Sequence, residues 1–331
     1  MVRLAINGFG RTGRTAARIA LKDKRVNLVA INSRANAASH AYLLKYDSIY
    51  KEFSLPVKEM GGSLLVNKKK IAVYQKELPE EIPWEKAGVD VVLECTGKFK
   101  TEEKTKGHLS HGVKQVIISA PVKDNSIPTV IMGVNNKTID KQAKIISNAS
   151  CTTNCLVVVC HILENHLKIK RGFMTTIHSP TDSQNLLDNS NKKTRLRRST
   201  LLSIIPYSTG ASIALGRVIP QLAGKFSCQC LRVPPLSASI IDLVVEVEKK
   251  TTPEAVNGFF QEASRTYLKG YLQVARDEIV GADIQGNTHS AILDPFLTDV
   301  IGGNLVKVFA WYDNEWGYST RLVDLVAYLA S

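Results

Sequence analysis

Short apolar runs that alternate with amphipathic stretches characterise the first half of the chain. Buried-strand patterns, separated by helical or loop stretches, occur at residues 2–7, 27–32, 71–73, 89–93 and 116–118. Strands that alternate with helices favour a parallel sheet, and such sheets bind ligands at the carboxyl ends of their strands. Residues 1–150 are therefore predicted to form an α/β Rossmann-type dinucleotide-binding domain.

The second half has a different pattern. Alternating strand patterns at residues 228–233, 239–247 and 305–312, with helices between them, predict an α+β catalytic domain on a mainly antiparallel sheet. We expect this domain to span residues 151–313 and to include a polar loop at 179–202. Residues 205–210 are expected to open a helix after this loop. Helical periodicity at the C-terminus leaves an apolar stripe that needs cover, so helix 314–331 is expected to complete the first domain.

One polar stretch precedes a strongly apolar helix. Residues 147–154 read S-N-A-S-C-T-T-N, and residues 155–163 form an apolar run without Pro or Gly. A thiol in the first turn of this helix, Cys151, would meet unpaired N–H groups and the positive end of the helix dipole, which favour a thiolate and can hold an oxyanion. The alternative is a structural cysteine, the commoner role of a Cys on an apolar helix. The polar neighbours Ser150, Thr152, Thr153 and Asn154 favour the reactive role.

A glycine-rich turn follows the first predicted strand. Residues 8–13 read G-F-G-R-T-G between a strand and a helix. Such glycines permit a tight turn and close approach to a pyrophosphate at the helix N-terminus. Expected cofactor contacts at this turn and at the ends of the later strands are Asn7, Gly8, Gly10, Thr96, Gly97 and Ser119.

The end of the second strand lacks an acidic residue. NAD-binding units commonly place Asp or Glu there to accept hydrogen bonds from the ribose 2′-OH. This chain has Asn32, Ser33 and Arg34 instead. A hydroxyl and a guanidinium suit a 2′-phosphate, which predicts NADP use. The alternative is an ordinary polar loop with the acid supplied from elsewhere.

Composition narrows the classes of function. The length of 331 residues suits two domains, and no apolar run has the length of a membrane span. No signal peptide is recognised, and six irregularly spaced cysteines do not resemble a disulfide framework, so a cytoplasmic location is expected. Cys151, Cys155, Cys160 and His161 contain no C-x-x-C pair, so no metal site is predicted.

The chain is strongly basic. Its net charge of +13 would fit nucleic acid, an anionic membrane or phosphorylated metabolites. No nucleic-acid motif occurs, and no amphipathic basic helix suggests a membrane surface. The densest basic run, residues 192–198, is interpreted first as a solvated loop.

Together these residues resemble the phosphorylating glyceraldehyde-3-phosphate dehydrogenases of the bacterial type I family, essentially end to end. The resemblance rests on I-N-G-F-G-R-T-G-R (6–14), K-Y-D-S (45–48), S-N-A-S-C-T-T-N-C (147–155), T-T-I-H-S (175–179), S-T-G-A (208–211), L-R-V-P (231–234) and W-Y-D-N-E-W-G-Y-S (311–319).

The resemblance implies a mechanism and a set of site residues. Cys151 would attack the aldehyde, His178 would pair with it as general base, and hydride transfer would leave a thioester that inorganic phosphate cleaves. A core histidine is the alternative role for His178. The family is typically a homotetramer in which the loop after the catalytic histidine reaches a neighbouring subunit. The implied contacts are Thr181 and Arg232 for the substrate phosphate, Ser150, Thr152, Thr209 and Gly210 for the attacking phosphate, Arg11 and Thr12 for the pyrophosphate, and Ser119 and Asn314 for the nicotinamide.

Three departures from the family pattern matter. Ser33 stands where members commonly have Asp, and Asn189-Ser190 replaces the Leu-Pro pair of NAD-specific members. Forms that use NADP are similar in carrying Ser at the position of Ser190, so both changes favour NADP. The third departure puts Leu196 where an arginine is expected to contact phosphate, so Arg195 or Arg197 is a candidate substitute.

Two alternative functions stay open at this point. Erythrose-4-phosphate dehydrogenase shares the Cys and His chemistry, although S-T-G-A at 208–211 favours the triose. A protein that binds nucleic acid or a surface through its basic charge is the alternative from a different class.

Overall fold

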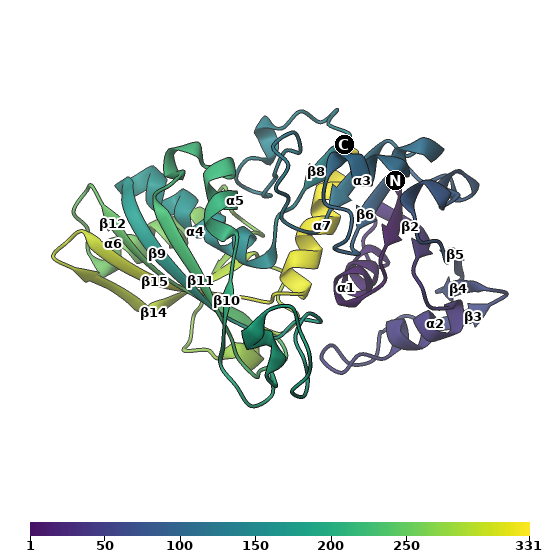
Figure 1. The fold of residues 1–331 in the computed structure, drawn as a ribbon. Coiled ribbons are helices and arrows are strands. Elements are labelled where there is room, and N and C mark those ends of the chain that lie inside the picture. The colour runs from purple at the N-terminus through teal and green to yellow at the C-terminus, as the bar shows by residue number, and fades with distance from the viewer. The chain divides into compact units, whose positions relative to one another are not determined.

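The computed structural model describes residues 1–331, which form two compact units (Figure 1). The first comprises Met1–Ser150 with Ser319–Ser331, and the second comprises Cys151–Tyr318. None of the helices combines the length and the apolar character that crossing a membrane requires.

The first unit is built on an eight-stranded sheet. Six of its strands are parallel, in the order β5 (Lys69–Tyr74), β2 (Val26–Asn32), β1 (Val2–Asn7), β6 (Val91–Glu94), β7 (Gln115–Ile118) and β8 (Ile145–Ser147). This order is that of a dinucleotide-binding sheet, in which the connections reverse between the two halves. The predicted Rossmann-type architecture is therefore confirmed, and the carboxyl ends of β2, β1 and β6 lie side by side.

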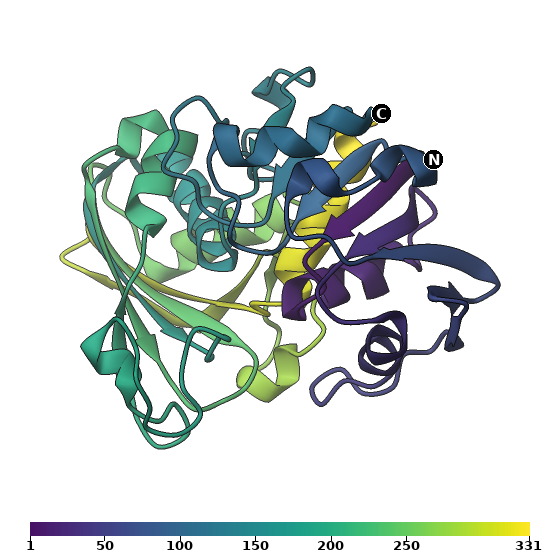
Figure 2. The same cartoon turned by 45° about the vertical axis from the view of Figure 1, so that its right-hand side comes forward.

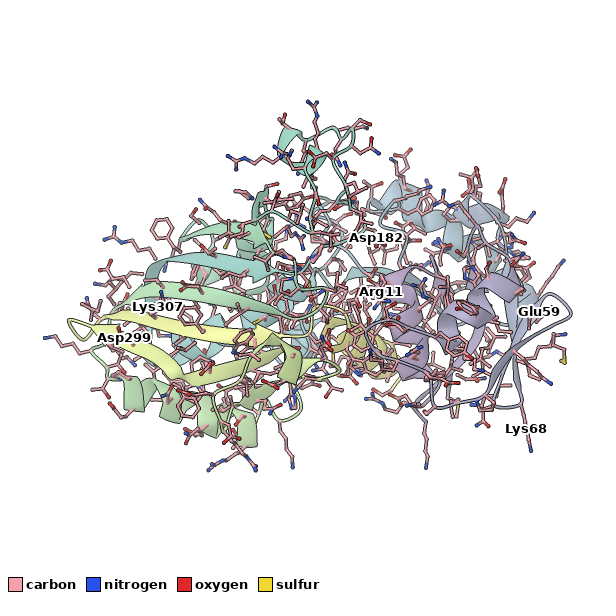
Figure 3. The ribbon with its side chains drawn as sticks, turned by 90° about the horizontal axis from the view of Figure 1, so that it is seen from below. Arg11, Glu59, Lys68, Asp182, Asp299 and Lys307 are labelled. Carbon is pink, nitrogen blue, oxygen red and sulfur yellow. The ribbon has the colours of Figure 1, made fainter.

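An antiparallel ribbon extends this sheet. It contains β3 (Val57–Met60) and β4 (Ser63–Val66). β3 pairs with β4, and β4 pairs with β5. Glu59 and Lys68 project from it (Figure 3). The sequence pattern had not identified this ribbon, because its strands are only four residues long.

Helices accompany the first sheet: α1 (Arg11–Ala20), α2 (Ala37–Lys45), α3 (Glu102–Thr105) and the final helix α7 (Trp316–Leu329). Figure 2 shows α7 along the strands of the first unit. Its apolar face is buried, Leu322 and Val326 being 0% exposed, and Ser319 Oγ donates to Thr12 O at 3.4 Å. The apolar stripe of this helix is thus covered by residues from the start of the chain.

The second unit is built on a seven-stranded mixed sheet. Its order is β10 (Ile205–Ser208), β11 (Phe226–Arg232), β9 (Ile169–His178), β12 (Ser239–Val247), β15 (Leu305–Tyr312), β14 (Ala291–Ile301) and β13 (Leu272–Val274). Only β9 with β11 and β13 with β14 are parallel, so the expected mainly antiparallel sheet is confirmed. Asp299 and Lys307 mark the β14–β15 hairpin (Figure 3).

The helices of the second unit are α4 (Cys151–Leu167), α5 (Ala211–Val218) and α6 (Pro253–Arg265). The central stretch of α4, residues 155–160, is 0% exposed. The apolar run seen in the sequence is therefore a core helix, and its first residue is Cys151.

One predicted helix start was wrong. Residues 205–210 were expected to open a helix, but Ile205–Ser208 form the edge strand β10 and the helix begins at Ala211. Pro206 fits an edge strand, where its missing N–H costs no ladder hydrogen bond on the open side. Short 3-10 segments complete the chain at Pro79–Glu81, Trp84–Ala87, Lys106–His111, Asn136–Thr138, Thr194–Arg197, Pro220–Leu222 and Gly281–Ile284.

Candidate active site

A thiol and an imidazole meet in the second unit. Cys151 is the first residue of α4, and His178 is the last residue of β9. The Cys151 Sγ lies 3.3 Å from His178 Nε2, although 27 positions separate them. Two residues far apart in sequence are therefore brought within direct proton-transfer distance.

The turn into α4 is strained. Ala149 is fully buried and has a φ of 54°, in the left-handed region that residues with a Cβ seldom occupy. Its N–H donates to Ser147 Oγ at 3.1 Å. Strain of this kind gathers where a surrounding structure must aim a side chain, and here the aimed residue is Cys151, two positions later.

Two contacts surround the imidazole nitrogen that faces away from the sulfur. His178 Nδ1 lies 2.7 Å from Ser179 O, which can only accept, and 2.5 Å from Arg232 Nη1, which can only donate. Nε2 is the nitrogen that faces Cys151 Sγ. In the tautomer with its proton on Nδ1, Nε2 presents a lone pair that can take the thiol proton.

Burial opposes charge on both groups. It raises the pKa of Cys151 to about 11, against the lowering effects of Arg232 and of the Thr152 N–H and hydroxyl. Burial and then the Arg232 guanidinium lower the pKa of His178 to about 3, although the bond to Ser179 acts in the other direction. The charged pair must therefore form in one step, in which opposite charges 3.3 Å apart attract by about 5 kcal/mol at an effective dielectric constant of about 20.

Arg232 is placed beside the histidine by strand register. It ends β11 in register with His178 on the parallel strand β9. Its Nη1 donates to Ser179 O at 2.7 Å, and its guanidinium carbon lies 5.3 Å from the centre of the Tyr207 ring. A fixed positive charge therefore stands next to the thiol and the imidazole.

Sequence reasoning missed a buried tyrosine beneath these groups. The Tyr312 hydroxyl lies 2.8 Å from both Thr152 Oγ1 and Thr176 Oγ1, and its ring meets that of His178 edge-on at 5.9 Å. Tyr312 falls inside the motif at 311–319, but a Tyr at the end of an apolar strand gives no separate functional signal. Its contacts hold the first turn of α4 against β9.

Asn314 is linked to the same centre through a serine. Its Oδ1 accepts from Ser239 Oγ at 3.2 Å, and Ser239 Oγ accepts from the Ser179 N–H at 3.2 Å. Asn314 therefore belongs to the network behind His178 in the second unit.

The residues expected to bind phosphate lie at two helix N-termini and in the polar loop. Thr209 and Gly210 lie at the N-terminus of α5, where Gly210 is the N-cap. Ser150 directly precedes Cys151 and is half-buried. Thr181 is exposed and its hydroxyl lies 3.1 Å from Ser183 Oγ. The two helix N-termini supply the backbone donors that anions favour.

The polar loop has its own cation arrangement. Lys193 Nζ donates to Ser208 Oγ at 3.2 Å and stands 4.3 Å from the Tyr207 ring centre, a ring that Arg232 also contacts. Lys193 and Arg195 line a cavity of about 250 Å³ with Tyr207 and Ser208. The sequence interpretation considered only arginines here and overlooked Lys193.

The other arginines of that run are engaged within the loop. Arg197 Nε donates to Asn191 O at 3.1 Å, and Arg198 pairs with Asp188 at 2.9 Å. Leu196 is buried, so it anchors the loop. Ser190 is exposed and lies in the second unit, whereas Ser33 and Arg34 belong to the first.

The glycine-rich turn of the first unit is packed as a dinucleotide cradle requires. A Cβ on Gly13 would lie 2.1 Å from Gly8 O, and one on Gly8, whose φ is 92°, would lie 2.6 Å from Thr96 N. A Cβ on Gly10 would meet nothing within 4 Å. The turn is thus closed on its protein side and open at Gly10, at the N-terminus of α1, which fits the approach of a pyrophosphate.

Other expected cofactor residues have protein partners. The Arg11 guanidinium, at the start of α1 (Figure 3), forms an ion pair with Asp47 and stands over the Tyr50 ring at 5.8 Å. The N–H and hydroxyl of Thr96 both donate to Glu94. Thr12 lies in the first turn of α1, and its N–H has no partner within the helix.

The remaining expected cofactor residues surround the same edge of the sheet. Asn7 ends β1, Gly97 has open space around it, and the Ser119 N–H donates to Glu94 O at 2.9 Å. Ser33 is half-buried and Arg34 is exposed after β2. These side chains lie at the carboxyl ends of neighbouring parallel strands, where dinucleotides bind.

No group of three or more His, Cys, Asp or Glu side chains is arranged to hold a metal ion. All six cysteines are free thiols.

Comparison with known proteins decides the family. The family model described as "Glyceraldehyde 3-phosphate dehydrogenase, NAD binding domain" matches residues 2–102, and "Glyceraldehyde 3-phosphate dehydrogenase, C-terminal domain" matches residues 150–314. The chain belongs to the glyceraldehyde-3-phosphate dehydrogenase family. It is accordingly an NAD(P)-dependent oxidoreductase with the nucleotide-binding and catalytic units described above.

Curated relatives align along the whole chain. The glyceraldehyde-3-phosphate dehydrogenase of Geobacillus stearothermophilus is 46% identical, over 100% of this chain and 98% of the relative. Glyceraldehyde-3-phosphate dehydrogenase 1 of Bacillus cereus is 45% identical, over 100% and 99%. Glyceraldehyde-3-phosphate dehydrogenase 2 of Bacillus subtilis (strain 168) is 43% identical, over 100% and 97%. These names favour a glyceraldehyde-3-phosphate dehydrogenase over the alternatives of a tetrose-phosphate enzyme or a nucleic-acid-binding protein.

Proposed function

We propose that the protein oxidises glyceraldehyde 3-phosphate with inorganic phosphate to 1,3-bisphosphoglycerate, reducing NAD(P) through a cysteine thioester. The observation that carries this proposal is the 3.3 Å approach of Cys151 Sγ to His178 Nε2 at the start of a buried helix. Membership of the glyceraldehyde-3-phosphate dehydrogenase family supplies the substrate class.

The chain's own groups account for the first half of the reaction. Cys151 sulfur adds to the aldehyde carbon while His178 Nε2 takes the thiol proton, and the helix N-terminus stabilises the oxyanion that forms. His178 then gives this proton to the oxyanion, which becomes the hemithioacetal hydroxyl. When bound, NAD(P) supplies the acceptor for the hydride that leaves this carbon. His178 accepts the proton that leaves the hydroxyl, and Cys151 then carries a thioester.

The second half transfers the acyl group. A phosphate oxygen attacks the thioester carbon, the carbon–sulfur bond breaks, and the electron pair returns to Cys151 sulfur. Arg232 and Thr181 are proposed to hold the substrate phosphate. Ser150, Thr152, Thr209 and Gly210 are proposed to hold the attacking phosphate.

The replacement Cys151→Ser tests the nucleophile. It should abolish phosphate-dependent NAD(P)H formation, because a serine hydroxyl is far less acidic than a thiol and forms no thioester. Turnover retained within tenfold of wild type would refute the proposal.

We also propose that the enzyme prefers NADP. Ser33 and Arg34 follow β2 without an acidic partner, and together with Ser190 they favour a 2′-phosphate over a 2′-hydroxyl. The replacement Ser33→Asp should raise the KM for NADP far more than that for NAD, because a carboxylate repels the extra phosphate. Equal changes in the two KM values would contradict the preference.

A third proposal concerns the basic loop. Lys193 and Arg195 line a cavity beside the Tyr207 ring on which Arg232 also rests, while Leu196 is buried. We propose that these two side chains supply the positive charge for the attacking phosphate that an arginine at position 196 would otherwise provide.

We propose a homotetramer in a reducing, cytoplasmic compartment. Exposed apolar side chains on the second unit, among them Phe173 and Leu202 at 71% and 87% exposure, favour burial against further subunits. The six free thiols suit a reducing compartment. Light scattering that gave the mass of one chain, 36.4 kDa, would exclude the tetramer.

A further inference from the structure

The carboxylate that accepts from Thr96 is buried at the carboxyl end of β6, and sequence reasoning gave it no role. Glu94 is 1% exposed. Its Oε2 accepts from Asn7 Nδ2 at 2.6 Å and lies 3.2 Å from His108 Nε2, while its Oε1 accepts from the Thr96 N–H at 2.7 Å and from the Thr96 hydroxyl. Four donors therefore converge on one buried side chain.

The histidine in this group is a donor to Glu94. Trp84 Nε1, which can only donate, lies 3.1 Å from His108 Nδ1, so Nδ1 accepts and the proton is on Nε2. The 3.4 Å contact between Asn7 Nδ2 and His108 Nε2 then joins two donors that share the same oxygen of Glu94. Trp84 and His108 are 0% exposed, so their bonds do not exchange with solvent.

The network continues across the sheet. Asn32 Nδ2 donates to Asn7 Oδ1 at 2.8 Å and to Lys76 O at 2.9 Å, and Asn32 Oδ1 accepts from the Lys76 N–H at 2.9 Å. Asn32 ends β2, Asn7 ends β1, Glu94 ends β6, and Lys76 follows β5. One chain of buried side chains thus ties the carboxyl ends of four neighbouring parallel strands.

These ties set the position of the two loops at the edge where the dinucleotide is proposed to bind. The Gly8 N–H donates to Asn32 O at 2.8 Å, and Gly8 packs so closely on Thr96 that a Cβ would lie 2.6 Å from its nitrogen. Thr96 Oγ1 also accepts from the Lys98 N–H at 3.1 Å, which folds the turn at Gly97. Because Thr96 gives both of its donors to Glu94, a displaced Glu94 would move the Thr96 loop and the Gly8 turn together.

We propose that Glu94 is a positioning residue for the dinucleotide, acting through Thr96 and Asn7 and oriented by His108. This role rests on the proposed NAD(P)-dependent function. Glu94 does not contact the cofactor. It keeps the glycine-rich turn and the Thr96–Gly97 turn in a binding arrangement before the ligand arrives, so that binding does not bear the cost of ordering them.

The replacement Glu94→Gln tests the role with almost no change in size. Each oxygen of the Glu94 carboxylate accepts from two donors. In the amide of glutamine one of these oxygens becomes an NH2 group, so two donors lose their acceptor and the turns shift. Isothermal titration should show about tenfold to 100-fold weaker binding of NAD and of NADP. The rate of Cys151 alkylation by iodoacetamide, a reaction in the other unit, should stay at the wild-type value, and kcat at saturating dinucleotide should fall much less than KM rises.

A second pair of variants keeps the test decisive if Glu94→Gln does not fold. His108→Gln retains an N–H donor near the position of Nε2, whereas His108→Phe removes it. Dinucleotide affinity should stay close to the wild-type value in His108→Gln and should fall in His108→Phe.

The outcomes separate this inference from the proposed function. If wild type binds neither NAD nor NADP, the proposed function fails. If wild type binds and Glu94→Gln lowers only the unfolding temperature, with unchanged dissociation constants, the positioning role is refuted. Equal affinities for the two His108 variants refute it as well.

Discussion

The Sγ of Cys151 and the Nε2 of His178 lie 3.3 Å apart because the first turn of α4 lies beside the last residue of β9. The pairing of β11 with β9 places Arg232 opposite His178. The charge of Arg232 therefore acts on both the thiol and the imidazole, and it lowers the pKa of each. This relationship makes the first prediction.

Replacing Arg232 by Gln should shift thiol reactivity to higher pH. Without the guanidinium the pKa of Cys151 rises, so the thiolate fraction at any pH below that pKa falls, by about tenfold for each unit. Iodoacetamide is neutral, so its reaction rate as a function of pH reports the thiol without involving phosphate binding.

A matched control removes an arginine charge from the far end of β9, the strand that ends in His178. Arg171 lies near the start of β9 and is 78% exposed. Arg171→Gln should leave the pH profile in place. A profile that is unchanged in Arg232→Gln, or shifted equally in both variants, would contradict the assignment.

His178 should make the fold sensitive to acid. Its pKa is about 3 in the folded chain because burial and Arg232 oppose its charge, and about 6.5 when unfolded. Between these two values the unfolded state binds a proton that the folded state does not, so stability falls as pH falls. The loss is about 1.4 kcal/mol for every pH unit across this window.

The measurement is urea unfolding of wild type and His178→Asn at several pH values from 7 to 4 (roughly the upper part of this window). The free energy of unfolding of the variant should decline less steeply, by about 1.4 kcal/mol per pH unit below about 6.5. Parallel declines would show that His178 is not held neutral in the folded state.

The glycine-rich turn should separate stability from binding. Gly13→Ala puts a methyl group 2.1 Å from Gly8 O, so the turn must open, at a cost of about 1–3 kcal/mol in unfolding free energy. Gly10→Ala meets nothing within 4 Å, so its stability should be close to wild type while dinucleotide affinity falls, because the methyl group fills the space left for the ligand. Thermal unfolding together with NAD(P) titration distinguishes the two variants, and a stable Gly13→Ala with unchanged affinity would contradict this account.

The sequence predicted the periodic part of the fold and the ends of its strands. The run at residues 155–163 and the strands at 239–247 and 305–312 have strong periodicity, and the structure gives Ser239–Val247 and Leu305–Tyr312 as strands. The ribbon β3–β4 was not predicted because strands of four residues carry too little pattern. Residues 205–208 were interpreted as a helix start because the signal that follows, Thr209-Gly210, belongs to the helix after them.

The site was predicted unevenly for a similar reason. The motifs predicted Cys151 and His178 as partners, and the structure brings their side chains to 3.3 Å. The supporting contacts depend on tertiary pairing, which no local pattern contains. Three such contacts join residues more than ten positions apart: Tyr312 with Thr152, Glu94 with His108 in the first unit, and Lys193 with the Tyr207 ring.

Lys193 carries the last prediction. Its ammonium lies 4.3 Å from the Tyr207 ring centre and donates to Ser208 Oγ, next to Thr209 and Gly210 at the start of α5. If it helps to hold the attacking phosphate, Lys193→Gln should raise the KM for inorganic phosphate by about tenfold, the size of effect expected for one charged hydrogen bond. The KM for the dinucleotide should not change.

Arg198→Gln is the control from the same loop, because Arg198 pairs with Asp188 at 2.9 Å and is exposed. Removing that charge should leave the KM for phosphate near the wild-type value. Arg195→Gln should resemble Lys193→Gln, since both side chains line the same cavity. A KM for phosphate that does not respond to either replacement would place the phosphate charge on Arg232 and the two helix N-termini alone, and the basic loop would then be a solvated surface.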